Sequence, residues 1–241
     1  MKSFALTDVG VKRTTNQDTI FISDQEVGAL PNLYIVADGM GGELAGDYAS
    51  ARCVEIVVDE VKHSKSSKPA EIFEQAIHEA NNLLYLEAKS DPLKNGMGTT
   101  FVAATIIENL LFVANVGDSR LYVAGNTKLT QITKDHSVVA ELVRNGELEE
   151  DAAKTDKRKN MITRAVGAEK NIQVDYFSVN LKGHERILLC SDGLTNMVED
   201  EDILKVLIST DTTENKATRL VELANNNGGK DNVSAIVIET I

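Results

Sequence analysis

The chain has 241 residues, of which 25 are basic and 37 acidic, and its formal net charge at neutral pH is −12. It therefore lacks the positive surface that non-specific nucleic-acid binding or docking on an anionic membrane requires. No apolar stretch approaches the ~20 residues of a membrane span, and residues 1–8 are too short and too soon acidic for a signal peptide. Cys53 and Cys190 lie in apolar patterns typical of buried free thiols. We therefore expect a cytoplasmic protein.

The N-terminal part of the chain combines short strands with two helices. Residues 4–6 and 19–22 are short apolar runs that flank a polar segment, and residues 33–37 form a longer run typical of a buried strand. Apolar residues then recur at three- and four-residue steps over residues 45–61 and 72–84, which predicts two amphipathic helices. Such regular apolar faces are assigned to the core.

Hairpins follow in the middle of the chain. Residues 101–107 and 110–116 are apolar and rich in β-branched side chains, and only two residues separate them, which predicts a hairpin with a two-residue turn. Residues 121–124 and 129–132 follow at hairpin spacing. Sequential hairpins form antiparallel sheets, which excludes a doubly wound parallel fold.

The segment from about residue 137 to 165 differs in character. It begins with a helical pattern over residues 138–143 and continues as a highly charged stretch. Two interpretations stay open: a solvated surface excursion, and a lid over a functional site. The remaining pattern is, in order, strands at residues 172–179 and 187–191, helices at residues 200–208 and 213–224, and a strand at residues 233–238. We expect one α+β domain over residues 1–241, with helices packed outside antiparallel sheets.

Aspartates stand at the ends of predicted strands. Asp38, Asp118 and Asp192 each follow an apolar run and adjoin a glycine, and Asp231 precedes the last run. Carboxylates at strand ends can converge from distant parts of the chain, but two of them about 4 Å apart repel by about 4 kcal/mol at an effective dielectric of about 20. Their convergence therefore indicates a cation. Ligation by oxygen alone favours Mg²⁺ or Mn²⁺ over zinc.

Such a centre suits phosphate chemistry. Two divalent ions held by Asp38, Asp192 and Asp231 would leave net positive charge, and a water bridging the ions would be a good nucleophile at neutral pH. Arg13 is a candidate for the phosphate, because a guanidinium binds two phosphate oxygens with its planar fork. Taken alone, Arg13 is better interpreted as an ordinary surface arginine.

Several short motifs resemble, in their order, those of the metal-dependent type-2C serine/threonine protein phosphatases. They are residues 13–18, 36–42, 98–100, 117–120, 191–193 and 229–234. Residues 133–137 and 162–167 also resemble the bacterial members of that family. The similarity extends from about residue 4 to the C-terminus. Each motif is weak by itself, and their joint order makes the resemblance specific.

The resemblance implies a four-layer α-β-β-α sandwich of two antiparallel sheets flanked by helices, with metal ions at one end. It implies that Asp38 bridges two Mn²⁺ or Mg²⁺ ions, that the Gly39 carbonyl binds one of them, and that Asp192 and Asp231 complete the coordination. The segment of about residues 137–165 would be the flap beside the active site.

The resemblance also implies roles for three further residues. Asp18 would act through a metal-bound water, and Arg13 would hold the substrate phosphate. Asp118, together with Asp192, would form the third metal site found in bacterial members.

A single residue and a pair of residues depart from the family pattern. Bacterial relatives usually carry a histidine directly after the glycine pair of residues 41–42, as a candidate proton donor, whereas this chain has Glu43. A glutamate donates a proton at neutral pH only if its pKa is raised. A histidine–proline pair common in the flap of relatives is Asp156 and Lys157 here.

The implied function is hydrolysis of phosphoserine and phosphothreonine by a water bridging two metal ions. The expected substrates are proteins phosphorylated by a serine/threonine kinase, and the expected state is a monomer. Two alternatives stay open: a catalytically weak regulator that binds phosphoproteins, and a phosphatase of small phosphorylated metabolites. The intact set of Arg13, Asp38, Asp192 and Asp231 argues against the regulator, which has no need of all these ligands.

Overall fold

The computed structural model describes residues 1–42, 45–153 and 155–240, and its strands form two antiparallel sheets. The five-stranded sheet has the order β1 (Lys2–Asp8), β11 (Val233–Glu239), β10 (Arg186–Cys190), β7 (Arg120–Ala124) and β8 (Leu129–Gln131). The six-stranded sheet has the order β2 (Asp18–Ser23), β3 (Leu33–Met40), β5 (Phe101–Ile107), β6 (Leu110–Val116) and β9 (Asp175–Asn180), with β4 (Gly98–Thr99) paired to the end of β3. The predicted hairpin is thus β5–β6.

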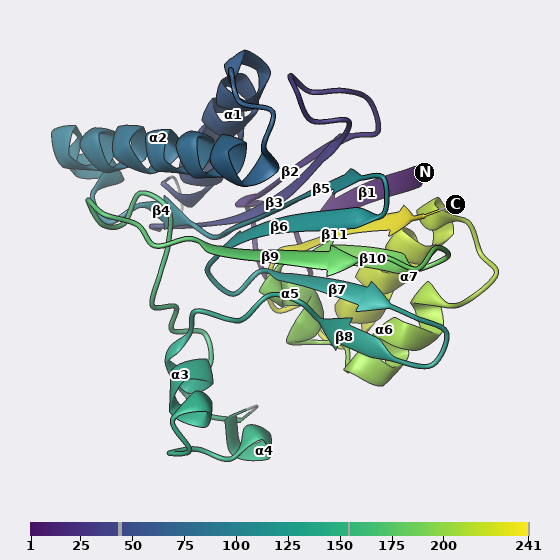
Figure 1. Ribbon diagram of the computed structural model, residues 1–241. Helices are drawn as coiled ribbons and strands as arrows, with labels where there is room; N and C mark the ends of the chain where they lie inside the picture. Colours follow the sequence, from purple (N-terminus) through teal and green to yellow (C-terminus); the bar gives the residue numbers. More distant parts are fainter. Residues whose placement is uncertain (43–44, 154, 241) are drawn as a thin grey trace.

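Helices cover the outer face of each sheet (Figure 1). Against the six-stranded sheet lie α1 (Gly46–His63) and α2 (Pro69–Ser90), followed by the 3₁₀ turn η1 (Pro92–Lys94). Against the five-stranded sheet lie α5 (Asp192–Thr195), α6 (Asp200–Leu207) and α7 (Thr213–Asn226). This is the four-layer α-β-β-α sandwich that the resemblance implied. None of the helices within the described residues has the length and apolar character needed to cross a membrane.

The alternation of side chains along the central strands builds three apolar layers. In β3, Ile35 and Ala37 pack toward α1 and α2, whereas Tyr34 and Val36 pack between the two sheets. This follows from the two-residue period of a strand, which sends successive side chains to opposite faces. Burial on both faces explains why residues 33–37 of β3 are all apolar, and Asp38 follows them directly within the same strand.

One predicted strand begins later than its pattern indicated. Residues 172–179 were expected to be a strand, but β9 begins at Asp175. Ile172 and Val174 instead pack, partly buried, against the apolar layer under α1 and α2. Their apolar character therefore serves the core from a loop, and periodicity alone does not distinguish that from a strand.

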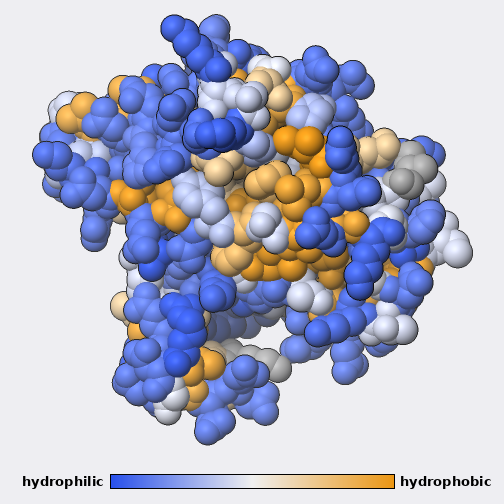
Figure 2. Space-filling model, viewed as in Figure 1, coloured by the Kyte–Doolittle hydropathy of each residue, from blue (hydrophilic) through white to orange (hydrophobic). Residues whose placement is uncertain are grey.

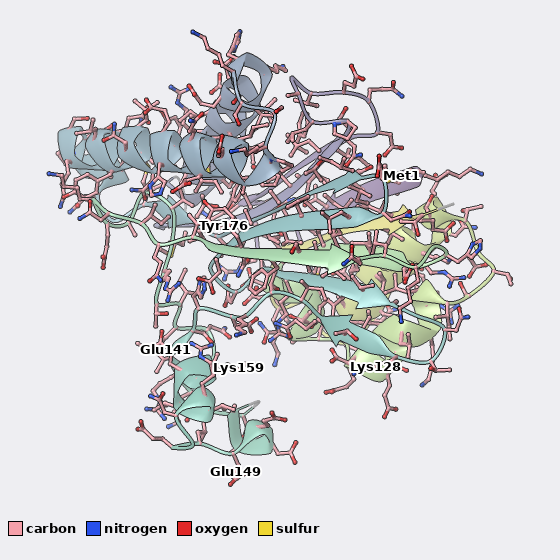
Figure 3. The ribbon with its side chains drawn as sticks, viewed as in Figure 1. Met1, Lys128, Glu141, Glu149, Lys159 and Tyr176 are labelled. Carbon is pink, nitrogen blue, oxygen red and sulfur yellow. The ribbon has the colours of Figure 1, made fainter. Side chains whose placement is uncertain are left out.

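The segment of residues 137–165 protrudes from the sandwich (Figure 1) and carries α3 (Val138–Arg144) and α4 (Glu150–Ala153). Its two ends are fastened to each other, because Val138 N donates to Met161 O at 2.8 Å and Thr163 N donates to His136 O at 2.7 Å. Figure 2 shows mostly hydrophilic side chains over it, and Figure 3 places Glu141, Glu149 and Lys159 on it. We call this segment the flap.

Candidate active site

A pocket of about 560 Å³ collects the strand-end aspartates. Its walls include Asp38 from β3, Asp118 after β6, Asp192 after β10 and Asp231 before β11. Arg13 lies in the same wall, and from the flap Asn160 and Ile162 contribute. The four carboxylates that were expected to converge therefore line one pocket.

Asp18 lies beside this pocket, buried next to Asp38. Antiparallel pairing of β2 with β3 sets the two residues opposite each other. The hydroxyls of Ser191 and Ser234 both donate to Asp18 Oδ2, each at 2.7 Å. Its other oxygen, Oδ1, is buried and has no hydrogen-bond partner among the described residues. A buried carboxylate oxygen without a donor is costly, so this atom is suited to a water or a cation.

Close backbone packing fixes the main chain at Asp38 and Gly39. The backbone N–H of Asp38 donates to Thr100 Oγ1 at 2.9 Å, and Thr99 Oγ1 donates to Asp38 O at 3.0 Å. A Cβ on Gly39 would lie 1.9 Å from Gly46 O, so a larger residue would displace the start of α1. Only glycine fits here, because α1 begins so close to the Gly39 backbone. Gly39 also lines the pocket.

Burial and mutual repulsion raise the pKa of the aspartates at this site. Burial, and then the charge of Asp18, raise the pKa of Asp38 well above its usual range. Burial raises the pKa of Asp18 to about 6 against opposing hydrogen bonds, and burial with the charge of Asp231 raises the pKa of Asp192 to about 6. Burial and the charge of Asp192 raise the pKa of Asp118 to about 8. Holding these four carboxylates ionised at neutral pH therefore requires positive charge beside them.

Neighbouring side chains supply only part of that compensation. Arg13 Nη2 lies 2.9 Å from Asp231 Oδ2, and Asn196 Nδ2 donates to Asp192 Oδ2 at 2.8 Å. In the described part of the chain, no three acidic, histidine or cysteine side chains are already gathered closely enough to hold one ion. The donor set nevertheless fits a hard divalent ion, because the pocket offers several carboxylates and the unpartnered Oδ1 of Asp18 lies next to it.

The loop that carries Arg13 is fastened by Asn232, a residue to which the sequence assigned no role. Asn232 Oδ1 accepts from Gln17 N, and Asn232 Nδ2 donates to Val9 O and Thr15 O, each at 2.9 Å. These bonds tie the loop to the start of β11. Asparagine beside aspartate is too common a pair to signal such a clamp from the sequence.

His136 has a structural place beside the site. Its Nδ1 accepts from Gly117 N at 3.0 Å, and its Nε2 lies 3.2 Å from Asp175 Oδ2. Burial lowers the pKa of this histidine. It therefore holds the turn that presents Asp118. Glu43, the candidate proton donor, lies outside the described residues.

The comparisons with known proteins decide the family. The family model for protein phosphatase 2C matches residues 10–233, which is most of the chain. The chain belongs to the protein phosphatase 2C family. As such it is a metal-dependent serine/threonine phosphatase.

Individual relatives of the phosphatase are bacterial. It is 43% identical over 211 residues to a serine/threonine phosphatase of Listeria monocytogenes, covering 86% of this chain and 84% of the relative. The structure of the serine/threonine phosphatase Stp1 from Staphylococcus aureus is similar with a TM-score of 0.93 and 33% identity, covering 100% of this chain and 94% of that one. A phosphatase domain solved with two manganese ions has a TM-score of 0.88 and 31% identity, covering 100% and 98%.

Proposed function

We propose that this phosphatase hydrolyses phosphoserine and phosphothreonine in proteins by direct attack of water at a centre of two Mn²⁺ or Mg²⁺ ions. The observation that carries the proposal is the convergence of Asp38, Asp118, Asp192 and Asp231 in one pocket with Arg13. When bound, such ions acidify water and offset the negative charge of a phosphate. No covalent phosphoenzyme is needed for this reaction.

Asp38 is proposed to be shared by the two ions, and the Gly39 carbonyl to bind one of them. Asp192 and Asp231 are proposed to supply the remaining protein ligands. The support is that these residues share the pocket and present only oxygen. Asp118 is proposed to hold a third ion together with Asp192, whose charge already raises the pKa of Asp118.

Asp18 is proposed to orient a water through its free oxygen. Its Oδ2 is fixed by two serine hydroxyls, so Oδ1 alone remains to accept a hydrogen bond. Arg13 is proposed to bind the substrate phosphate. It is paired with Asp231 at 2.9 Å, and its side chain is 51% exposed, so it can turn to a phosphate when the Asp231 carboxylate is otherwise engaged.

Glu43 is proposed as the proton donor to the leaving serine or threonine oxygen. It takes the place of the histidine usual in bacterial relatives, directly after the glycine pair. Donation requires the neutral acid, and a glutamate at its ordinary pKa is ionised at pH 7. The proposal thus implies a raised pKa for Glu43, or slower turnover of substrates with poor leaving groups.

We further propose that the substrates are products of a serine/threonine kinase, and that the phosphatase works in the cytoplasm as a monomer. Two buried free thiols, Cys53 and Cys190, support a reducing compartment.

The direct test compares three substrates with Mn²⁺ present: a phosphothreonine peptide, an aryl phosphate and a sugar phosphate. We expect turnover of the peptide and of the aryl phosphate, with little turnover of the sugar phosphate. A preference for the sugar phosphate would favour the metabolite phosphatase. Binding of the phosphopeptide without turnover of any substrate would favour the phosphoprotein-binding regulator.

A further inference from the structure

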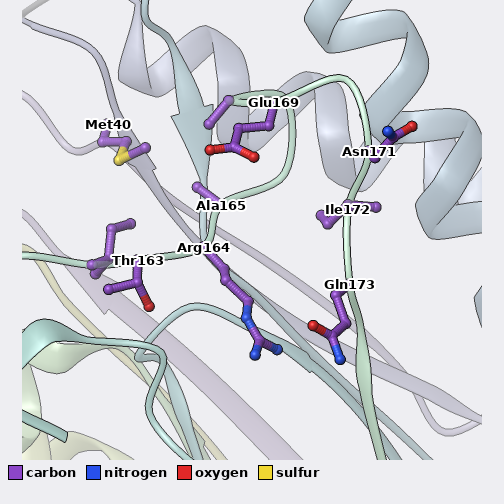
Figure 4. Close-up of a pocket in the computed structure, with 10 residues that line it drawn as sticks. Met40, Thr163, Arg164, Ala165, Glu169, Asn171, Ile172 and Gln173 are labelled. Carbon is purple, nitrogen blue, oxygen red and sulfur yellow. The ribbon is translucent and has the colours of Figure 1, made fainter. Parts of the chain in front are cut away.

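A second pocket, of about 460 Å³, adjoins the candidate active site (Figure 4). Met40 and Ile162 line both pockets, so the two share a wall. The second pocket lies where the chain returns from the flap and turns toward β9. A peptide whose phosphorylated residue occupies the first pocket can therefore place a neighbouring side chain in the second. We call this second pocket the side pocket.

The side pocket has an apolar lining that suits a long aliphatic stem. Met40, Ile162, Ala165 and Ile172 contribute apolar side chains to it. Arginine and lysine bury their methylene stems against such surfaces while their charged heads seek a polar partner. The lining is therefore compatible with a basic side chain as well as with a purely apolar one.

The charges of the side pocket decide between these two occupants. Arg164 Nη1 lies 3.0 Å from Asp175 Oδ1, so its positive charge is compensated within the protein. Glu169 forms no ion pair with any residue that the structure describes, and it is exposed. Figure 4 shows the Glu169 carboxylate turned toward the space beside Met40 and above Ala165. The free charge in the side pocket is thus negative, and it favours a cation.

We propose that the side pocket binds an arginine or lysine of the phosphoprotein substrate, close in sequence to the phosphorylated residue, and that Glu169 selects it. The inference rests on the proposed function, because it places the phosphorylated residue in the adjoining pocket. A guanidinium would pair with the carboxylate while its stem lies on the apolar lining. The net charge of −12 adds a field that draws basic segments toward the protein.

The test uses a phosphothreonine peptide of alanine and glycine in which one arginine is moved along the positions on either side of the phosphothreonine. We expect kcat/KM with Mn²⁺ to rise by about fivefold at one position, as a single accessible ion pair provides. Glu169→Gln should abolish that rise, and Glu169→Lys should convert it into a preference for glutamate. Hydrolysis of an aryl phosphate, which leaves the side pocket empty, should be unchanged in both variants.

Glu222→Gln is the matched control, because it removes the same charge from an exposed position on α7. It should keep the arginine preference, which separates a local contact from the overall field. An arginine preference that survives Glu169→Gln, or no preference at any position, would overturn the inference and leave the proposed function intact. Absence of turnover of every peptide and of the aryl phosphate by the unmodified protein would instead overturn the proposed function.

Discussion

At the scale of single residues, the site combines acids that the sequence marks with partners that it does not. Asp38, Asp118 and Asp192 could be selected because each follows an apolar run, and Asp231 because it precedes one. Ser191 and Ser234, which hold Asp18, come from β-sheet neighbours that only the register of β10 and β11 brings together. A serine just after a strand, such as Ser191, or inside one, such as Ser234, carries no comparable signal, so this support was not predictable.

Asp18→Asn should separate stability from activity. The amide keeps an oxygen that can accept from Ser191 and Ser234, and it removes a buried carboxylate whose pKa is raised to about 6. We expect the metal-free protein at about pH 8 to gain about 1–3 kcal/mol in the free energy of unfolding, while phosphopeptide turnover with Mn²⁺ falls at least about tenfold. Denaturant unfolding and steady-state kinetics measure the two effects. Loss of stability together with full activity would contradict the role proposed for Asp18.

Glu43→His tests the proton donor. An imidazole with a pKa near 6.5 donates a proton at neutral pH more readily than a glutamate of ordinary pKa. We expect a faster reaction of the phosphothreonine peptide, by about tenfold or more, and little change for an aryl phosphate with a good leaving group. If the peptide reaction gains nothing, Glu43 does not limit the protonation of the leaving group.

At the scale of elements, the strongly periodic segments were predictable and the short ones were not. The stripe of residues 72–84 became α2, and the apolar runs of residues 101–107 and 110–116 became β5 and β6 with the same bounds. The four-residue helices α4 and α5 are too short to show a period. The late start of β9 shows the same limit, because Ile172 and Val174 are buried from a loop.

The flap is linked to the site by a chain of hydrogen bonds. Lys159 Nζ donates to Asn196 Oδ1 at 3.3 Å, and Asn196 Nδ2 donates to Asp192 Oδ2 at 2.8 Å. Within the flap, Asp156 is instead engaged locally, because Arg158 Nη2 lies 2.9 Å from its Oδ2. Asp156 therefore pairs with a residue of the flap itself. Lys159 makes the contact toward the pocket.

Lys159→Ala should loosen the flap at the pocket. We expect the KM for a phosphothreonine peptide to rise by about two- to fivefold, since one partly exposed contact is lost, with aryl phosphate turnover unchanged. The control is Lys157→Ala, which removes the same charge from an exposed flap position. Equal effects of the two variants would show that flap charge matters and that the link through Asn196 does not.

At the scale of the whole molecule, an acidic chain gathers several aspartates in one pocket, where burial and mutual repulsion raise their pKa values. Folding sets their pKa values above the unfolded value of 3.8, with Asp118 near 8 and Asp38 well above its usual range. When folding raises the pKa of a carboxyl, its contribution to the free energy of unfolding is fully present at pH values below the unfolded-state pKa. That contribution is lost as the pH rises through the folded pKa.

The stability of the metal-free phosphatase should therefore fall as the pH rises. Between about pH 6.5 and 8.5 we expect a loss of about 1–2 kcal/mol in the free energy of unfolding, from the ionisation of Asp118 and its neighbours. The lowered pKa of His136 acts only below its usual value of 6.5, outside this window. With Mn²⁺ the loss should disappear. Urea unfolding measures it, and a metal-free stability that is constant across this window would contradict the raised pKa values.

The central claim is that the carboxylates of this pocket bind the ions on which hydrolysis depends. The most direct measurement is phosphothreonine-peptide turnover after complete chelation, followed as Mn²⁺ is restored, for the unmodified protein and for Asp38→Asn. We predict no turnover in chelator, a saturable return with Mn²⁺, and turnover of Asp38→Asn lower by at least about a thousandfold. Turnover that survives complete chelation, or an Asp38→Asn variant as active as the unmodified protein, would contradict the account.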